Sequence, residues 1–360
     1  MKNILAVILV ILLSLPFAVW WFFGKETPIN VVILDKTVPV DNYREHKSFM
    51  WLLNNLKYVN SKTGTPFVYH EDYYGFFPLP DKKYAIKELP DVVKDVDLIY
   101  IADTYGVYTE DFYGENLRGE RSKLIYGGLT AKEITSIEKG LNNSNILVAE
   151  YNAFATPTTA EARYLIENLL GVKWTGWIGR YFDDLSSTNT EVPLWLVRNY
   201  EKQYGKKWEF TGPGVAYDNI DDTVVVLQAG TDFGSKHVRV VFSPAAVSEY
   251  NVRNNVEYEY WFDIIEPAQD SQVLAEYHLD VTEEGAKKLN EYGLPSSSPA
   301  IVKRFAKYRT YYFAGDYADK RNIPQFWNYK DFRQVAGIGD FYWQVYYPLM
   351  QKVLTEIKHQ

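Results

Sequence analysis

Strand-like and helix-like segments alternate along residues 29–171, and this alternation limits the possible folds of the chain more than any other feature. The run INVVILD at residues 29–35 is almost continuously apolar, as strands buried on both faces of a parallel sheet are. Further short runs that suit strands occur at residues 66–69, 97–102 and 146–150. These runs predict four neighbouring strands of one sheet.

Helix signals lie between the strand candidates. Thr130 and Glu133 have the spacing of a capping box, in which each residue's side chain accepts a hydrogen bond from the other's backbone N–H. Thr158 and Glu161 repeat this spacing before a second amphipathic segment. Because strands and helices follow each other in turn, the sequence predicts an α/β fold with a doubly wound parallel sheet.

The pattern changes beyond about residue 205. In VEYEYWF, residues 256–262, apolar and acidic residues alternate, which is typical of a half-exposed antiparallel strand. The first pattern returns near residue 298, and the final helix candidate, residues 339–357, is apolar around much of its circumference and should be buried. The predicted organisation is a membrane anchor and linker at 1–28, the first part of the α/β domain at 29–204, a β-rich insertion at 205–295, and closing strands with a C-terminal helix at 296–360.

The amino terminus carries an uncharged stretch from Ile4 to Gly24, about the length needed to cross a bilayer. Aromatic residues 20–23 suit the far headgroup boundary. A cleaved signal peptide is the alternative, but residues 16–18 make a poor cleavage site, and no cysteine follows to carry a lipid. The sequence therefore predicts a signal-anchor transmembrane helix, with a single pass through the cell membrane and an extracytoplasmic C-terminal domain.

Composition excludes several classes of function. The net charge of −8 and the pI near 5.3 argue against a nucleic-acid partner, which requires a basic footprint. The absence of cysteine excludes disulfides, thiolate nucleophiles and zinc–thiolate sites. The chain has 30 Tyr, 10 Trp and 19 Phe, which suits the binding of sugar rings and equally suits a packed core.

Most motifs of nucleotide-binding and catalytic sites are absent from the sequence. The sequence has no Walker pattern, dinucleotide fingerprint or Gly-x-Ser-x-Gly elbow. Its five histidines show no paired metal spacing. No cofactor and no metal site are predicted.

One region resembles a known family. The segments DLIYIADTYG (97–106) and GGLTAKEITSIEKGLNNSNILVAEYNAF (127–154) are similar to the core of the class I glutamine amidotransferase-like superfamily, in the style of its trehalose-utilisation-type members. The resemblance covers residues 29–185 and 298–357 and implies a flavodoxin-like sheet. Active amidotransferases need a nucleophilic cysteine and a His-x-Glu pair. The chain has neither, so the resemblance implies a catalytically degenerate domain and not glutamine hydrolysis.

Acidic residues stand at the ends of the predicted strands. Since the carboxyl ends of parallel strands meet at one edge, Asp35, Asp103, Glu150 and Asp316 should converge there. Clustered carboxylates raise each other's pKa, and most glycoside hydrolases use a pair of carboxylates for catalysis. Asp103 and Glu150 are therefore the candidate catalytic pair. The candidate ligand-binding residues are Asp35, Tyr105, Arg121, Tyr151, Asn152, Arg180 and Asp316.

The alternative interpretation of these residues is structural, because strand-end carboxylates often cap helices or hold loops. Two functional hypotheses follow. In the first, a membrane-anchored, catalytically degenerate domain binds a glycan ligand or an envelope protein partner, in the assembly or export of surface polysaccharide. In the second, a membrane-anchored glycan hydrolase uses the strand-end carboxylates.

Overall fold

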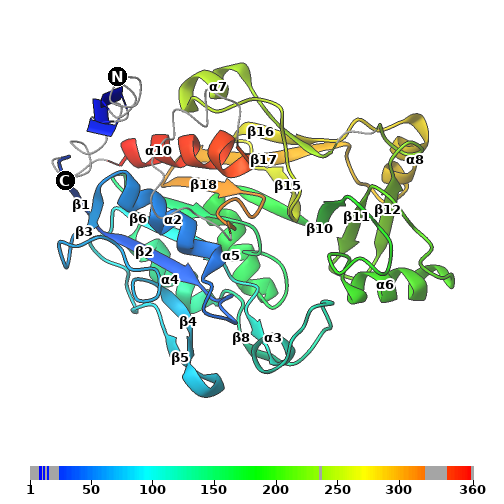
Figure 1. The fold of residues 1–360 in the computed structure, drawn as a ribbon, viewed down its shortest axis with the longest axis horizontal. Coiled ribbons are helices and arrows are strands. Elements are labelled where there is room, and N and C mark those ends of the chain that lie inside the picture. Colours follow the sequence, from blue (N-terminus) through cyan, green and yellow to red (C-terminus); the bar gives the residue numbers. More distant parts are fainter. Residues whose placement is uncertain are drawn as a thin grey trace.

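A ten-stranded sheet forms the centre of the computed structural model, which describes residues 8–9, 11–12, 14–15, 24–234, 237–320 and 339–357 (Figure 1). The strand order across the sheet is β14-β13-β16-β17-β18-β9-β6-β2-β4-β5. In chain order the strands are β2 (Val31–Asp35), β4 (Tyr74–Leu79), β5 (Lys83–Lys87), β6 (Leu98–Asp103), β9 (Ile146–Ala149), β13 (Arg239–Phe242), β14 (Val256–Glu257), β16 (Gln272–His278), β17 (Ser297–Phe305) and β18 (Arg309–Phe313).

The sheet is mixed, so the prediction of a doubly wound parallel sheet is wrong. Only β18, β9, β6, β2 and β4 pair in parallel, and the strands outside them pair antiparallel. The reason lies in the connections. A single 3-10 turn (Pro80–Lys82) joins β4 to β5, and residues 306–308 join β17 to β18. Connections this short allow only antiparallel pairing, whereas parallel strands need a long crossover.

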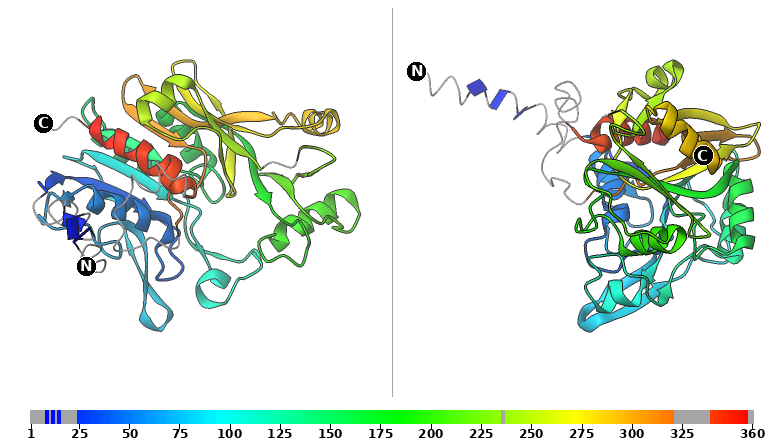
Figure 2. Two further views of the ribbon diagram at one scale, coloured as in Figure 1. Left: turned by 45° about the horizontal axis from the view of Figure 1, so that its top comes forward. Right: turned by 90° about the vertical axis from the view of Figure 1, so that its right-hand side faces the viewer.

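Helices cover both faces of the parallel strands, as the two views of Figure 2 show. On one face lie α2 (Arg44–Asn55) and α10 (Tyr347–Thr355), which continues the π-helical turn Tyr342–Tyr346. They are joined by the hydroxyl of Tyr342, which donates to Ser48 O at 2.9 Å. On the other face, α4 (Ala131–Gly140) packs against α5 (Ala160–Leu170).

A second, four-stranded antiparallel sheet has the order β12-β11-β10-β15 and lies beside the large one. Its strands are β10 (Val172–Phe182), β11 (Gly214–Asn219), β12 (Val224–Gln228) and β15 (Phe262–Pro267), and its flanking helix is α6 (Leu194–Tyr204). The predicted insertion, residues 205–295, contributes strands to both sheets. The remaining elements are β1 (Thr27–Ile29), β3 (Tyr58–Asn60), β7 (Val107–Tyr108), α3 (Thr109–Tyr113), β8 (Leu124–Tyr126), α7 (Pro244–Tyr250) and α8 (Glu283–Glu291).

The predictions made from short sequence motifs were partly right, and the structure explains each outcome. The capping box of Thr130 and Glu133 is present. The second helix is capped by Thr159, one residue later than predicted, because Thr158 accepts a hydrogen bond from Leu129 N instead. No strand forms at 66–69, since the side chain of Asn54 takes both backbone groups of Phe67 that a strand neighbour would have bonded.

The predicted membrane anchor, residues 4–24, lies mostly outside the described residues. Within the residues that the structure describes, no helix is long and apolar enough to cross a membrane. This finding corrects the predicted transmembrane helix, together with the membrane as a partner and the single-pass location.

Candidate functional site

Four neighbouring parallel strands of the large sheet end at carboxylates. Asp35 and Asp103 are the last residues of β2 and β6, and they pair directly in the strand register. Glu150 directly follows β9, and Asp316 follows β18 by three residues. Because these strands are adjacent and parallel, their carboxyl ends form one edge, which we call the acidic rim. The predicted convergence of the four residues is therefore present.

Asp103 is buried at the centre of the acidic rim and is surrounded by donors. Its Oδ1 accepts from the hydroxyl of Thr37 at 2.5 Å and from the backbone N–H of Tyr105 at 2.7 Å. Its Oδ2 accepts from the side-chain amide of Asn152 at 2.8 Å. Burial raises the pKa of Asp103 to about 6, although these hydrogen bonds oppose the rise by favouring the ionised form.

Asp35 is paired with a histidine from the first turn of α2. His46 Nδ1 lies 2.5 Å from Asp35 Oδ2, and both side chains are fully buried. The other ring nitrogen, Nε2, lies 2.7 Å from the carbonyl oxygen of Tyr69 and must donate to it. A proton therefore lies between Nδ1 and Asp35 Oδ2, and the pair fixes the start of α2 on the acidic rim.

Glu150 ties the segment after β18 to the acidic rim. Its Oε2 accepts from the backbone N–H groups of Tyr317 at 2.9 Å and Ala318 at 3.0 Å. Its Oε1 accepts from the hydroxyl of Tyr100, which also contacts the hydroxyl of Tyr346. Burial raises the pKa of Glu150 to about 8, against the effect of these hydrogen bonds.

A second group of carboxylates lies at the acidic rim, and the sequence-based prediction named only one of its members. Glu45, Asp316 and Asp319 each place a carboxylate oxygen within 4.8 Å of the others. Burial raises the pKa of Glu45 and of Asp316, and the negative charges of their neighbours raise both further. Arg44 supplies a positive charge, with Nε 2.7 Å from Glu45 Oε1.

The predicted aromatic and amide residues fall at different depths of the acidic rim. Tyr105 is 39% exposed, and its ring lies 4.8 Å from that of Tyr108 at an interplanar angle of 36°. Asn152 is partly buried, has a left-handed backbone and bonds Asp103. Tyr151 is buried, and its pKa is raised, first by burial and then by the charge of Asp263.

The two predicted arginines contact the four-stranded sheet. Arg180, on β10, forms an ion pair with Glu191 and lies over the ring of Phe182. Neither of these contacts joins Arg180 to the acidic rim. Arg121 lies 2.6 Å from Asp222 in the turn between β11 and β12, and its charge still acts on Tyr105. Arg121 therefore stands between the acidic rim and the smaller sheet.

Sequence reasoning missed Thr37, Asp263 and Asp319 as rim residues. Asp319 repeats the acidic type three residues after Asp316, and Asp263 interrupts the apolar run WFDII. Asp263 is fully buried, accepts from the hydroxyl of Tyr312, and has its pKa raised by burial to about 7. A charged residue inside an apolar strand was the available signal.

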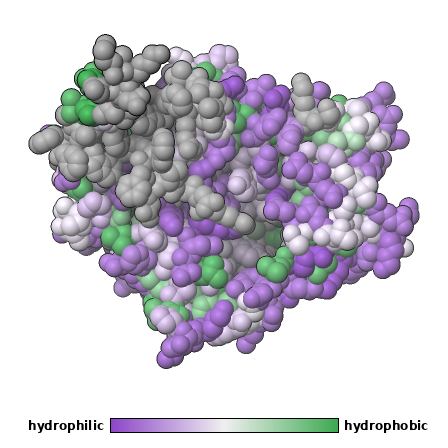
Figure 3. Space-filling view, viewed as in Figure 1, coloured by the Kyte–Doolittle hydropathy of each residue, from purple (hydrophilic) through white to green (hydrophobic). Residues whose placement is uncertain are grey.

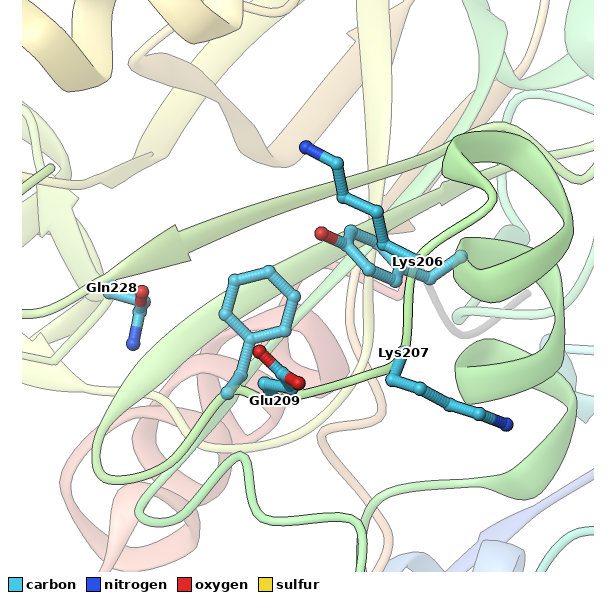
Figure 4. Close-up of a pocket in the computed structure, with 6 residues that line it drawn as sticks. Lys206, Lys207, Glu209 and Gln228 are labelled. Carbon is cyan, nitrogen blue, oxygen red and sulfur yellow. The ribbon is translucent and has the colours of Figure 1, made fainter.

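Figure 3 shows a hollow near the middle of its face. A cavity lies in the smaller sheet. The cavity, of about 450 Å³, is lined by Tyr200, Lys206, Lys207, Glu209, Phe210 and Gln228. In Figure 4 the Lys207 side chain extends away from Gln228, and no predicted site residue lines this cavity.

Comparisons with known proteins identify no family. No protein-family model matches the chain, and no curated protein matches it. Solved structures with a similar course of the chain include a protein described as ThuA-like from Bacteroides uniformis, with a TM-score of 0.42 and 11% identity over 93% of each chain. A cytoplasmic protein from Salmonella typhimurium has a TM-score of 0.34 and 13% identity, over 76% of this chain and 77% of that one.

A third similar structure is the exo-beta-1,4-mannosidase of an Opitutaceae bacterium, with a TM-score of 0.35 and 10% identity over 90% of this chain and 36% of that one. The ThuA-like neighbour is of the type that the sequence resembles. At these TM-scores, however, the likeness is weak and assigns neither a family nor an activity.

Proposed function

We propose that the chain is a non-catalytic binding protein whose ligand contacts the acidic rim at Tyr105, Tyr108 and Asn152. The observation that carries this proposal is the complete engagement of Asp103 and Glu150. Every carboxylate oxygen of these two residues is engaged in at least one hydrogen bond with the protein itself. Both residues are nearly inaccessible, with 4% and 1% exposure. Such groups hold the rim together and have no free oxygen for a substrate.

The hydrolase alternative draws on the raised pKa values of Asp103 and Glu150, because a catalytic acid needs a pKa near the working pH. A glycosidase acid must also reach the glycosidic oxygen. Burial is the main cause of both raised values, and the same burial keeps a substrate away. Binding without turnover is therefore the better account of this geometry.

The ligand class follows from the groups that remain accessible. Tyr105 and Tyr108 offer an aromatic surface, and Asn152 and Arg121 stand near it with polar groups. Ligand sites commonly combine aromatic walls with a few polar groups that fix orientation. Hydroxyl-rich rings match both features, so we assign a saccharide as the ligand.

Tyr105→Ala is expected to weaken saccharide binding at least tenfold, equivalent to about 1.4 kcal/mol, because it removes the exposed ring of the aromatic pair. The measurement is a glycan array with the labelled full-length chain, followed by titration calorimetry with the best glycan. Tyr164→Ala is the matched control, since Tyr164 is 66% exposed on α5, away from the rim residues. It should bind as the unmodified protein does.

Two results would contradict the proposal. The first is the absence of any bound glycan, or equal binding by Tyr105→Ala. The second is turnover of a bound glycan that Glu150→Gln abolishes, which would establish the hydrolase alternative.

A further inference from the structure

We propose that Glu45, Asp316 and Asp319 form a binding site for a hard divalent cation, with calcium the best fit. The three residues come from two parts of the chain that are far apart in sequence. Glu45 lies in the first turn of α2, and the two aspartates lie in the segment after β18. Each offers one carboxylate oxygen, and the three oxygens lie within 4.8 Å of one another. This inference stands apart from saccharide binding, which uses other side chains.

The strongest observation is an unsatisfied oxygen in a buried side chain. The Glu45 side chain is only 3% exposed, and its Oε1 accepts from Arg44. Its Oε2 is buried and has no hydrogen-bond partner among the described residues. A buried carboxylate oxygen without a partner loses its hydration without compensation, and this loss is costly for a charged group. A bound cation would supply the missing partner.

The local charge also favours a bound cation. Three carboxylates meet here, and Arg44 brings one positive charge to two of them, Glu45 and Asp319. Arg44 is engaged mainly with Glu45, since its Nη1 lies 3.5 Å from Asp319 Oδ2, which is long for a hydrogen bond. Asp316 has no ion pair with a described residue, and it is only partly buried. An additional positive charge would therefore reduce repulsion, and Asp316 gives it access from solvent.

The donor set selects the type of cation. All three ligands are carboxylate oxygens, which suit calcium and magnesium and not the softer metals that prefer nitrogen or sulfur. Magnesium demands near-ideal octahedral geometry, keeps several waters and is usually held by only one or two carboxylates. Calcium accepts a flexible set of about six to eight oxygens. A site with three protein carboxylates therefore suits calcium better.

Terbium luminescence tests the site directly, because terbium binds calcium sites and is excited through nearby tyrosines. The hydroxyl of Tyr258 accepts from Asp316 N at 2.6 Å, and Tyr260 is close enough for Asp316 and Asp319 to raise its pKa, after the larger effect of burial. The full-length chain should give a saturable signal that calcium displaces, and calcium alone should raise its melting temperature. Magnesium should displace terbium at least tenfold less well.

Glu45→Gln keeps the shape of the side chain and should weaken terbium and calcium binding at least tenfold. Asp316→Asn is a second variant, at a less buried position, in case Glu45→Gln does not fold. Asp218→Asn is the matched control, because Asp218 is a buried carboxylate near Asp222 in the smaller sheet. It should bind terbium as the unmodified chain does.

The proposal is overturned if the unmodified chain gives no saturable terbium signal and no calcium-induced rise in melting temperature. It is also overturned if a folded Glu45→Gln or Asp316→Asn variant binds as tightly as the unmodified chain, or if Asp218→Asn loses binding equally. Because saccharide binding is measured on Tyr105→Ala without added calcium, failure of one proposal is distinguishable from failure of the other.

Discussion

Replacing Glu150 with glutamine should make the free energy of unfolding less dependent on pH between about pH 4.5 and 8. Burial raises the pKa of Glu150 from 4.5 in the unfolded chain to about 8 in the folded protein. Between these values the folded protein keeps a proton that the unfolded chain has released. The contribution of Glu150 to stability is therefore fully present below pH 4.5 and is lost as the pH rises to 8.

The size of the effect follows from this single proton. It makes the free energy of unfolding fall by about 1.4 kcal/mol per pH unit. Glutamine does not titrate, so Glu150→Gln lacks this slope. Glutamine also resembles the protonated acid. Its carbonyl oxygen can accept from Tyr317 and Ala318, and its amide can donate to the Tyr100 hydroxyl. Glu150→Gln should consequently be more stable than the unmodified protein at pH 8.

Urea unfolding at several pH values measures this slope. Glu115→Gln, at an exposed position, is the control and should leave the slope unchanged. Glu150→Ala should be destabilised at every pH by about 1–3 kcal/mol, since two buried N–H groups lose their acceptor. An unchanged slope in Glu150→Gln would show that Glu150 is ionised in the folded protein and would overturn this prediction.

Gly75→Ala should destabilise the protein by about 4 kcal/mol or more, an effect reserved for changes that distort buried structure. Gly75 lies in β4 with φ of +129° and pairs with Asp35 on one side and Lys87 on the other. An added Cβ would lie 1.7 Å from Asp35 O and 2.6 Å from its carbonyl carbon. Neither atom belongs to a flexible side chain, so β4 must separate from β2, and Asp35 must move.

Gly64→Ala separates this steric effect from backbone strain. Gly64 also has a positive φ, of +69°, but no atom lies within 4 Å of an added Cβ. Gly64→Ala should lower the free energy of unfolding by only about 1 kcal/mol, the cost of a left-handed conformation for a residue with a side chain. Chemical denaturation of both variants gives the comparison. Equal destabilisation of Gly75→Ala and Gly64→Ala would mean that a small backbone movement relieves the contact with Asp35.

Features that depend on short stretches of chain were predictable from the sequence. The apolar runs that became β2, β6 and β9 were found, because a strand buried on both faces needs uninterrupted apolar residues. The capping box at Thr130 was found because the hydrogen bonds that define it join two residues only three positions apart. The resulting rim of Asp35, Asp103, Glu150 and Asp316 followed from parallel strand order alone.

Features that depend on competition between distant groups were not predictable. Asn54 occupies the backbone of Phe67, so the expected strand at 66–69 is absent and β4 takes its place in the sheet. Predicting the antiparallel outer strands would have required knowing which hairpin pairs with which edge of the parallel part of the sheet. A pattern in one segment carries no information about the partner that finally bonds it.

Carboxylates at the ends of four parallel strands could be predicted from local pattern, because strand identity and strand-end residues are local properties. The role of those carboxylates depends on the folded structure. This structure supplied hydrogen-bond partners to every oxygen of Asp103 and Glu150, and it brought Glu45 from the start of α2 to Asp316 and Asp319, near the other end of the chain. The physical reason is that hydrogen bonding and charge repulsion act at distances of a few ångströms, which only the folded chain establishes.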